Sequence, residues 1–278
     1  MLDFVYYPVA AVLWLWHTGF AVLFGAASGL SWALAIVMLV VTLRAALYRP
    51  FLAQVRFSRT MAVLQPKMRQ LRAECGDDRE RLAVETRKLQ QQHNFNVLSG
   101  CLPVLVQLLM FLGLLHVLHS FDRTGGGSYV PFLGNTTAMS AAQNADTANY
   151  VFAPEQVRSF LHADLFGAPL SATLTSTDSV ASVAVVAIPL VLIAAVATHC
   201  TARASIARQL EITPQMRLIN AMTLWLFPLG TLVAGLVMPV GILVYFATSN
   251  TWTFVQQHVV HRRLGPLEPL PPPAVPTI

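Results

Sequence analysis

One arginine lies inside a long apolar run, where a charged side chain is unexpected. The run is SWALAIVMLVVTLRAALYRPF, residues 31–51, which is long enough to cross a bilayer, and Arg44 stands well inside it. An ionisable group at membrane depth is energetically expensive, so by default it indicates function. A permanently charged group in this position is suited to receiving an anion.

Snorkelling is one alternative, because a long arginine side chain can reach back to the membrane surface. Arg44 lies about seven residues, or ~10 Å of helix, from the end of its run. Helical side chains lean toward the N-terminus of their helix, and the loop charges described below place that N-terminus outside. The guanidinium should therefore lean deeper into the membrane rather than toward the nearer surface.

A buried ion pair is the second alternative, but none of the 13 acidic residues lies within an apolar run. Neutral polar side chains do occur on the other runs: Gln107, Thr198, Asn220, Thr223, Ser249, Asn250, Thr251 and Gln256. Each of these is compatible with ordinary hydrogen bonding between membrane helices. Together with Arg44 they predict a polar cavity inside a bundle of helices.

The composition is that of a membrane protein with several spans. Of the 278 residues, 55% are hydrophobic and 11% are charged, and the mean hydropathy is +0.58. Soluble domains carry about 25% charged residues. The cysteines Cys75, Cys101 and Cys200 imply no disulfide and have no metal-ligand spacing with histidines, so neither a metal nor a cofactor is expected.

The apolar runs predict an all-α polytopic membrane protein, a five-helix transmembrane bundle with a cytoplasmic helical hairpin and an N-terminal interfacial helix. The run 219–258 would reach about 60 Å as one helix, twice the hydrocarbon thickness, so it should fold back near Met238. The predicted segments are 1–27 (N-terminal helix), 28–51, 98–121, 180–200 and 219–258 (transmembrane helices), 52–97 (hairpin), 122–179 (extracytoplasmic loop), 201–218 (cytoplasmic loop) and 259–278 (cytoplasmic, Pro-rich tail).

Residues 4–24 leave two placements open. They form an apolar stretch with an aromatic cluster but no basic region in front and no convincing cleavage site, so a signal peptide is not expected. The stretch either spans the membrane or lies in the interface, where Tyr and Trp are enriched. The interface is favoured, because the amino terminus has no basic residue to hold it in the cytoplasm.

Basic residues set the predicted orientation. Of the 18 Lys and Arg residues, 15 fall in 49–97, 201–217 and the tail, whereas the loop 122–179 holds only Arg123 and Arg158. Lys and Arg concentrate on the cytoplasmic side of membrane proteins. The hairpin and the C-terminus should therefore be cytoplasmic and the loop 122–179 outside.

The charged block 52–97 is predicted to be two helices joined at Gly76-Asp77-Asp78, a turn and helix-start signal. One interpretation is a solvated loop. The other is a contact surface for another protein, for lipid headgroups or for ribosomal RNA. Either way, few apolar residues hold the hairpin to the bundle, so it should be mobile and dispensable for the fold.

Several short motifs occur in a recognisable order. They are Thr42-Leu43-Arg44, Tyr48-Arg49-Pro50, Leu64-Gln65-Pro66-Lys67, Gly76-Asp77-Asp78-Arg79, Gly100-Cys101-Leu102-Pro103 with Gln107, Phe166-Gly167-Ala168-Pro169-Leu170, Trp225-Leu226-Phe227-Pro228, Tyr245 through Asn250, and Gln256-Gln257. Over about residues 4–263 the chain resembles the YidC family of membrane protein insertases, in the style of its actinobacterial members.

The resemblance implies a hydrophilic groove that opens to the cytoplasm and to lipid, in which membrane proteins are inserted and folded, alone or beside the Sec translocon. Arg44 matches the family's groove arginine, and Gln107 and Tyr245 match positions that face it. Thr42, Ser249 and Asn250 complete the predicted client-binding set. The implied partners are nascent membrane proteins, the Sec translocon, the ribosome and membrane lipids, but no DNA.

Three departures from the family pattern are visible. Val40 replaces an often polar residue four positions before the arginine, and Phe246 stands where a second tyrosine would follow Tyr245. Both make the groove less polar. The tail lacks the long basic extension that many members use near ribosomes, which weakens the expectation of ribosome docking through it.

Two other function classes are considered. A small-solute transporter or channel usually couples to protons through intramembrane Asp, Glu or His; here no carboxylate is available, and His116, His119 and His199 stand near span ends. A membrane-embedded enzyme would need a nucleophile–base set, a metal motif or a nucleotide motif, and we find none with plausible spacing. The chain is therefore expected not to be an enzyme.

Overall fold

The computed structural model describes residues 3–76, 78–92, 98–124, 138–175, 180–209, 212 and 214–265. The elements are α1 (Asp3–Phe24), α2 (Gly29–Ala46), α3 (Tyr48–Cys75), α4 (Arg79–Gln92), α5 (Leu98–His119), α6 (Ala141–Ala145), α7 (Pro154–His162), β1 (Asp164–Leu165), β2 (Ala168–Pro169), α8 (Val180–Ile206), α9 (Pro214–Val237) and α10 (Val240–Leu264). The predicted Pro-rich tail beyond Gly265 and the junction 93–97 lie outside the described residues.

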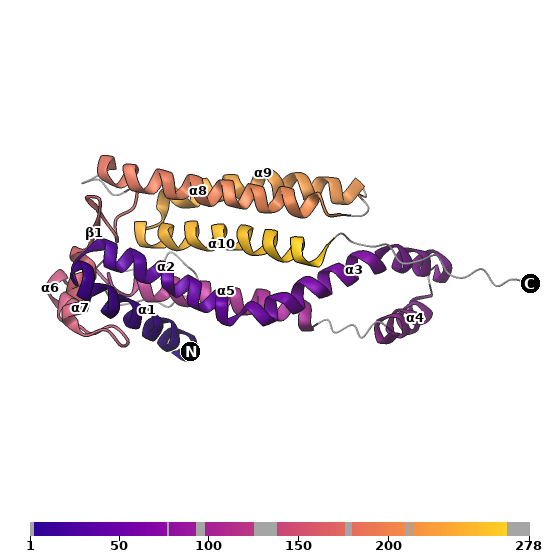
Figure 1. Cartoon of the computed structure of the whole chain (residues 1–278), viewed down its shortest axis with the longest axis horizontal. Helices are drawn as coiled ribbons and strands as arrows, with labels where there is room; N and C mark the ends of the chain where they lie inside the picture. Colours follow the sequence, from indigo (N-terminus) through magenta and orange to yellow (C-terminus); the bar gives the residue numbers. More distant parts are fainter. Residues whose placement is uncertain are drawn as a thin grey trace, which may run out of the picture.

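The long helices form an elongated bundle with two different ends (Figure 1). The loop end is made of residues 138–175, which hold α6, α7 and the antiparallel pair β1–β2. The basic end is made of α3, α4, the last turn of α8, the first turn of α9 and the last turns of α10. The segments that carry most of the Lys and Arg residues thus gather at one end, opposite the loop.

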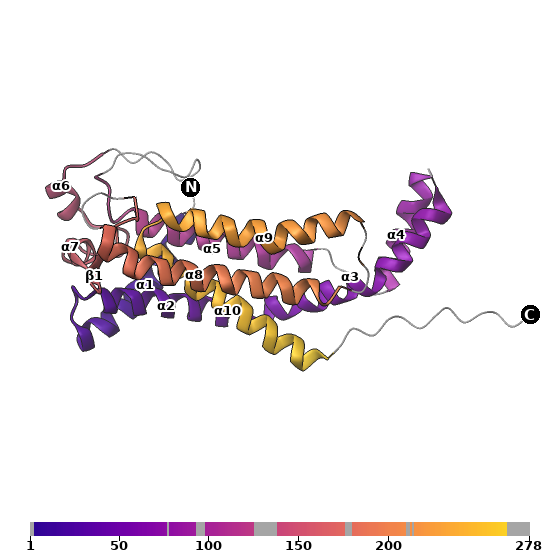
Figure 2. The same cartoon turned by 90° about the horizontal axis from the view of Figure 1, so that it is seen from above.

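Three helices form one side of the bundle. α8 packs against both α9 and α10, and Figures 1 and 2 show these three helices running along the long axis together. α10 also packs against α2, which joins this group to α1, α2 and α5. α9 is peripheral, since only Pro228 and Gly235 are buried in it. A Cβ on Gly235 would lie 2.3 Å from Val191 Cγ2, so α8 and α9 approach closely because this residue has no side chain.

Helix α2 ends earlier than the predicted boundary at residue 51. Its last residue is Ala46, Leu47 makes a turn with φ −87° and ψ 9°, and α3 begins at Tyr48. Pro50 has no N–H to donate to the carbonyl of Ala46, and a proline is tolerated in the first turn of a helix. The helical hairpin therefore starts at Tyr48, and its turn lies at Gly76, whose φ is +54°.

Three other helices extend beyond the predicted apolar runs: α8 at its end, α9, which begins at Pro214 instead of 219, and α10, which ends at Leu264 instead of 258. The turn between α9 and α10 lies at Met238 and Pro239, where the fold-back was expected. α8 runs on to Ile206, beyond the predicted end of its span at Cys200. The added residues TARASI contain two alanines and an arginine, which are good helix formers, so the helix continues past the apolar run.

Within the part of the chain that the structure describes, four helices are long and apolar enough to cross a membrane by length and composition: α1, α2, α8 and α9. The described apolar part of α5, Leu105–His119, is shorter. This helical architecture confirms an all-α polytopic membrane protein.

Helix α1 lies across the loop-end half of the bundle. Near its start, the ring of Tyr6 stacks on His116 of α5 with centroids 4.1 Å apart. Near its end, the carbonyl of Phe20 accepts a hydrogen bond from Ser31 Oγ in the first turn of α2 at 3.3 Å. Both ends of α1 thus contact residues close to the loop end. Between them, Trp16 Nε1 donates to Thr42 Oγ1 near the other end of α2 at 3.0 Å. The interfacial placement of residues 1–27 therefore stays a prediction.

A cluster of aromatic rings closes the loop end around Trp32 of α2, which is fully buried. His17 stacks on the indole at a centroid distance of 3.7 Å, and Phe121, Phe152 and Phe160 surround it at 5.4, 5.6 and 5.1 Å. These rings come from α1, α2, the end of α5 and the loop. The loop is therefore part of the hydrophobic core rather than a loose connection.

Hydrogen bonds complete this closure. Trp32 Nε1 donates to Ser159 Oγ at 3.1 Å, and Ser159 Oγ in turn donates to the carbonyl of Ala26. The Tyr150 hydroxyl makes a 2.7 Å hydrogen bond with His116 Nε2. Burial, followed by the negative charge of Asp3, raises the pKa of Tyr150 to about 12, so this hydroxyl stays protonated at neutral pH.

Candidate functional site

Arg44 lies in the last turn of α2 and turns its guanidinium toward α10. Its Nη2 donates to Ser249 Oγ at 2.9 Å and to Thr253 Oγ1 at 2.9 Å, and it lies 3.4 Å from the Ser249 carbonyl oxygen. The side chain is half-buried. A snorkelling arginine would extend toward the membrane surface, so these contacts across the bundle argue against that alternative.

The partners of Arg44 are neutral. Among the described residues the ion pairs are Lys88–Glu85, Arg158–Asp146 and Arg158–Glu155, and Arg44 takes part in none of them. Its Nη1 and Nε donate to no described group, and neither is among the buried polar atoms that lack a partner. No described carboxylate therefore neutralises the charge of the guanidinium, and its other nitrogens can donate to another molecule.

Three side chains on α10 form a polar stripe beside Arg44: Tyr245, Ser249 and Thr253. They are spaced by four residues and so share one face of the helix. Tyr245 is 7% exposed, and its hydroxyl lies 3.5 Å from Gln107 Nε2 of α5. The stripe brings Gln107, Tyr245, Ser249 and Arg44 together from α5, α10 and α2.

Two of the predicted site residues point elsewhere. Thr42 Oγ1 donates to the carbonyl of Met38 at 2.7 Å and accepts from Trp16 Nε1 of α1 at 3.0 Å. Asn250 accepts from Thr198 Oγ1 of α8 at 3.1 Å and donates to the carbonyl of Phe246. These side chains join helices together and make no hydrogen bond to Arg44.

Most of the other neutral polar residues also have separate partners. Asn220 and Gln209 exchange two amide hydrogen bonds at 2.9 and 2.6 Å near the basic end. Thr223 donates to the carbonyl of Ile219 in its own helix. Gln256 accepts from Trp252 Nε1 at 2.9 Å. Of the eight neutral polar residues singled out from the sequence, only Ser249 bonds to Arg44 directly.

Thr253 is the partner that the sequence prediction missed. The signal for it was present, because Thr253 follows Ser249 by four residues and therefore lies on the same face of α10.

Among the described residues no group of three or more His, Cys, Asp or Glu side chains forms a metal site. The chemistry that this arrangement supports is the reversible binding of an anionic or polar group.

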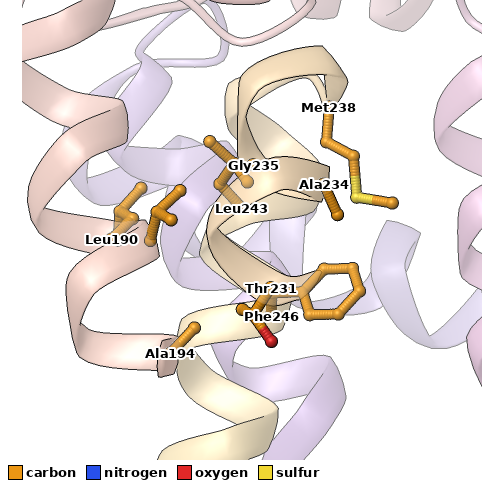
Figure 3. Close-up of a pocket in the computed structure, with 9 residues that line it drawn as sticks. Leu190, Ala194, Thr231, Ala234, Gly235, Met238, Leu243 and Phe246 are labelled. Atoms are coloured by element: carbon orange, nitrogen blue, oxygen red, sulfur yellow. The ribbon is translucent and has the colours of Figure 1, made fainter. Parts of the chain in front are cut away.

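A small pocket lies elsewhere, between α8, α9 and α10 (Figure 3). Its lining is apolar apart from one hydroxyl and consists of Leu190, Val191, Ala194, Thr231, Ala234, Gly235, Met238, Leu243 and Phe246. The Thr231 hydroxyl already donates to the carbonyl of Phe227 at 2.9 Å. The pocket therefore has no group that would bind an anion, and it is separate from the polar site at Arg44.

Comparison with known proteins identifies the family. The family model described as "60Kd inner membrane protein" matches residues 23–266. A protein of Mycolicibacterium paratuberculosis named membrane protein insertase YidC is 45% identical over 270 residues, which cover 93% of this chain and 75% of the relative. Proteins of the same name from Mycobacterium tuberculosis and Mycobacterium leprae are each 44% identical, with 93% of this chain and 72% and 70% of those relatives covered.

The matched residues take in α2, with its half-buried arginine, and all of α10 with its polar stripe. Identity of this level over nearly the whole chain confirms the resemblance seen in the motifs. The chain belongs to the 60Kd inner membrane protein family, the family of the YidC membrane protein insertases.

Proposed function

We propose that this protein inserts membrane proteins and helps them to fold, alone or beside the Sec translocon, through the polar site at Arg44. The observation that carries the proposal is a guanidinium inside an apolar bundle that is held by the hydroxyls of Ser249 and Thr253 and by no carboxylate among the described residues. The relatives named membrane protein insertase support the same function. No enzymatic activity is expected.

In this proposal the basic end faces the cytoplasm and the loop end faces outward. The gathering of the basic segments at one end supports this orientation, since Lys and Arg concentrate on the cytoplasmic side. Nascent chains, the ribosome and lipid headgroups would then meet α3, α4 and the end of α10. Cysteines placed singly in 79–89 should react only after the membrane is opened, whereas cysteines in 141–162 should react in intact cells. Labelling of 79–89 from outside would overturn this orientation.

Arg44 acts in this scheme by attracting acidic or polar segments of a client into the bundle. Among the described residues, only one of its nitrogens has a hydrogen-bond partner, so a carboxylate can approach the others without displacing an existing ion pair. The attraction in a partly hydrated site is about 2 kcal/mol, well below its value in a dry interior. Such a contact lowers the energy of passing a charge through the membrane and still releases the client.

Substitutions of Arg44 test this role with two clients that differ only in the charge of the translocated tail. Arg44→Ala should lower insertion of the acidic-tailed client by roughly thirtyfold, the equivalent of ~2 kcal/mol, and spare the neutral-tailed client. Arg44→Lys should retain partial activity because it keeps the charge but loses the planar fork. Arg44→Glu should be worse than Arg44→Ala for the acidic tail.

Matched controls separate attraction from a structural role. Thr253→Ala removes a partner of Arg44, whereas Thr223→Ala removes an exposed hydroxyl of α9 that bonds only within its own helix. We expect the first to alter the preference between the two clients and the second to leave it unchanged. Equal impairment of both clients by all three Arg44 variants would show that the residue is structural and would exclude the attraction mechanism.

A small-solute transporter or channel is the alternative, and depletion of the protein discriminates between them. For an insertase, single-span membrane proteins should fail to insert after depletion, and client segments should cross-link to residues near Arg44. For a transporter, purified protein in liposomes should catalyse vectorial flux of a solute while insertion proceeds normally. Normal insertion after depletion would overturn the proposed function.

A further inference from the structure

The β1–β2 pair ends in a tight turn with an unusual residue at its tip. Asp164 pairs with Pro169 and Leu165 with Ala168, so Phe166 and Gly167 form a two-residue loop. Their φ angles are +53° and +80°, the left-handed combination of a type I′ turn. Such a turn favours Asn, Asp or Gly in the first position, and a bulky aromatic residue with positive φ is an outlier.

Packing inside the protein does not explain the phenylalanine. Its neighbours Leu165 and Ala168 are 9% and 0% exposed, whereas Phe166 is 83% exposed. The ring therefore contributes little to the core, although its backbone conformation is unfavourable for it. A residue that breaks a local rule without a compensating contact inside the molecule indicates a contact outside it.

The position of the β1–β2 turn along the bundle indicates what Phe166 contacts outside the molecule. A Cβ on Gly29, the first residue of α2, would lie 1.9 Å from the Asp164 carbonyl oxygen, so β1 touches the start of an apolar helix. Val240 N and Gly241 N, in the first turn of α10, donate to the carbonyls of Ala172 and Leu170 at 3.0 and 2.9 Å. Figure 1 shows β1 level with the beginning of α2.

At this level the bundle should leave the hydrocarbon layer, because two candidate spans begin here. α2 is a candidate span that begins at Gly29, and α8, another candidate span, begins at Val180. Two further apolar side chains at these helix starts, Leu30 and Val180, are 39% and 48% exposed. An exposed apolar side chain at this depth meets the boundary between lipid headgroups and acyl chains, where aromatic rings are favourable.

The polar groups of the turn are compatible with that environment. Asp164 Oδ1 accepts a hydrogen bond from Gly167 N at 3.3 Å, which satisfies an amide that would otherwise face a less polar layer unpaired. We propose that Phe166 is an interfacial anchor whose ring inserts among phospholipids at the headgroup–acyl boundary of the leaflet next to the loop end. The anchor fixes the depth of the loop end, and it does not depend on the proposed insertase function.

A fluorescent label tests the anchor. In a chain with Cys75, Cys101 and Cys200 replaced by Ser, Phe166→Cys carries a polarity-sensitive fluorophore in vesicles of phosphatidylethanolamine and phosphatidylglycerol. Two matched sites are Glu155→Cys on α7, whose side chain is 74% exposed, and Val185→Cys on α8, which is 70% exposed. We expect blue-shifted emission at 166 relative to 155, and stronger quenching by lipids with a nitroxide near the headgroup than by lipids with a deep nitroxide. At 185 the deep nitroxide should quench more.

A second variant keeps an aromatic ring in place without a label. Phe166→Trp should add emission to that of the parent protein, and this added emission should be quenched by lipids brominated near the glycerol. Emission and quenching at 166 equal to those at 155 would overturn the anchor. Shielding from water without quenching by either lipid would show that a protein surface covers Phe166, and it would overturn the anchor as well.

Discussion

At the loop end, Trp32 is fully buried among rings from four segments of the chain, whereas at the basic end α4 buries none of its described side chains. α3 buries only Val55, Leu64 and Cys75 over its 28 residues. Both ends are made of long segments that connect apolar helices, and the lengths of these segments alone would not distinguish one end from the other. The two ends differ in how much apolar surface each connecting segment buries inside the protein.

The comparison indicates two mechanical roles. Buried rings and satisfied hydrogen bonds make the loop end a rigid closure, because opening it would expose a hydrophobic core. The basic end has few buried contacts and can move at little energetic cost. Arg44 lies between them, at the end of α2, with its partners on α10. A polar site between a well-packed end and a sparsely packed end is compatible with the proposal that clients enter from the basic end.

The largest effect is expected from removing the ring at the centre of the closure. Trp32→Ala should lower the free energy of unfolding by about 4 kcal/mol, since it leaves a cavity among the surrounding phenylalanines. The matched control is Trp225→Ala on α9, whose side chain is 61% exposed, and we expect little change there. Thermal unfolding of purified protein in detergent measures both. Equal losses would mean that the loop end is no more rigid than the periphery.

A smaller loss is expected where α2 meets the loop. Gly29→Ala places a methyl group 1.9 Å from the Asp164 carbonyl oxygen, so the backbone must shift at a cost of about 3 kcal/mol. Gly230→Ala in α9 is the control, because nothing lies within 4 Å of its Cβ position. That change should be neutral or stabilise the helix by about 0.5 kcal/mol. Denaturant titration followed by circular dichroism compares them, and a tolerated Gly29→Ala would contradict the close contact.

The hydrogen bonds of one hydroxyl in the closure should have a modest effect. Ser159→Ala removes both the acceptor of Trp32 Nε1 and the donor to the Ala26 carbonyl, and it should lower stability by about 1 kcal/mol. Ser205→Ala, at an exposed position near the end of α8, serves as the control with no expected change. Differential scanning fluorimetry detects the shift. If the two variants melted at the same temperature, the hydrogen bonds of Ser159 would not contribute to the rigidity of the loop end.

The smallest effect on stability is expected in the helical hairpin. Leu82→Ala in α4 should change the free energy of unfolding by less than about 0.5 kcal/mol, since Leu82 is only half-buried. Amide hydrogen exchange should be fast in 79–92 and slow in 29–46. Strong protection throughout 79–92 would remove the contrast between the two ends.

Local sequence features predicted much of the site. They did not predict which of the polar side chains would face Arg44. Arg44 was singled out because a charge within residues 31–51 is costly, and Ser249 because it is polar on an apolar run. Helical spacing could have added Thr253. Thr42 and Asn250 were equally polar, yet they bond to Trp16 and Thr198 instead. Which face of a helix meets which neighbour depends on packing between segments far apart in the chain.

The sequence by itself determined the helices, their apolar lengths, the turn at Met238, the separation of basic segments from the loop and the family. These features arise from interactions over a few residues or from transfer between water and lipid, which composition and periodicity record directly. Only the tertiary structure decided that Arg44 meets Ser249 and Thr253, that Trp32 closes the loop end, and that Phe166 is exposed at the level where α2 begins. Each of these depends on the rotation and offset of one element against another, which side-chain packing fixes and local sequence does not encode.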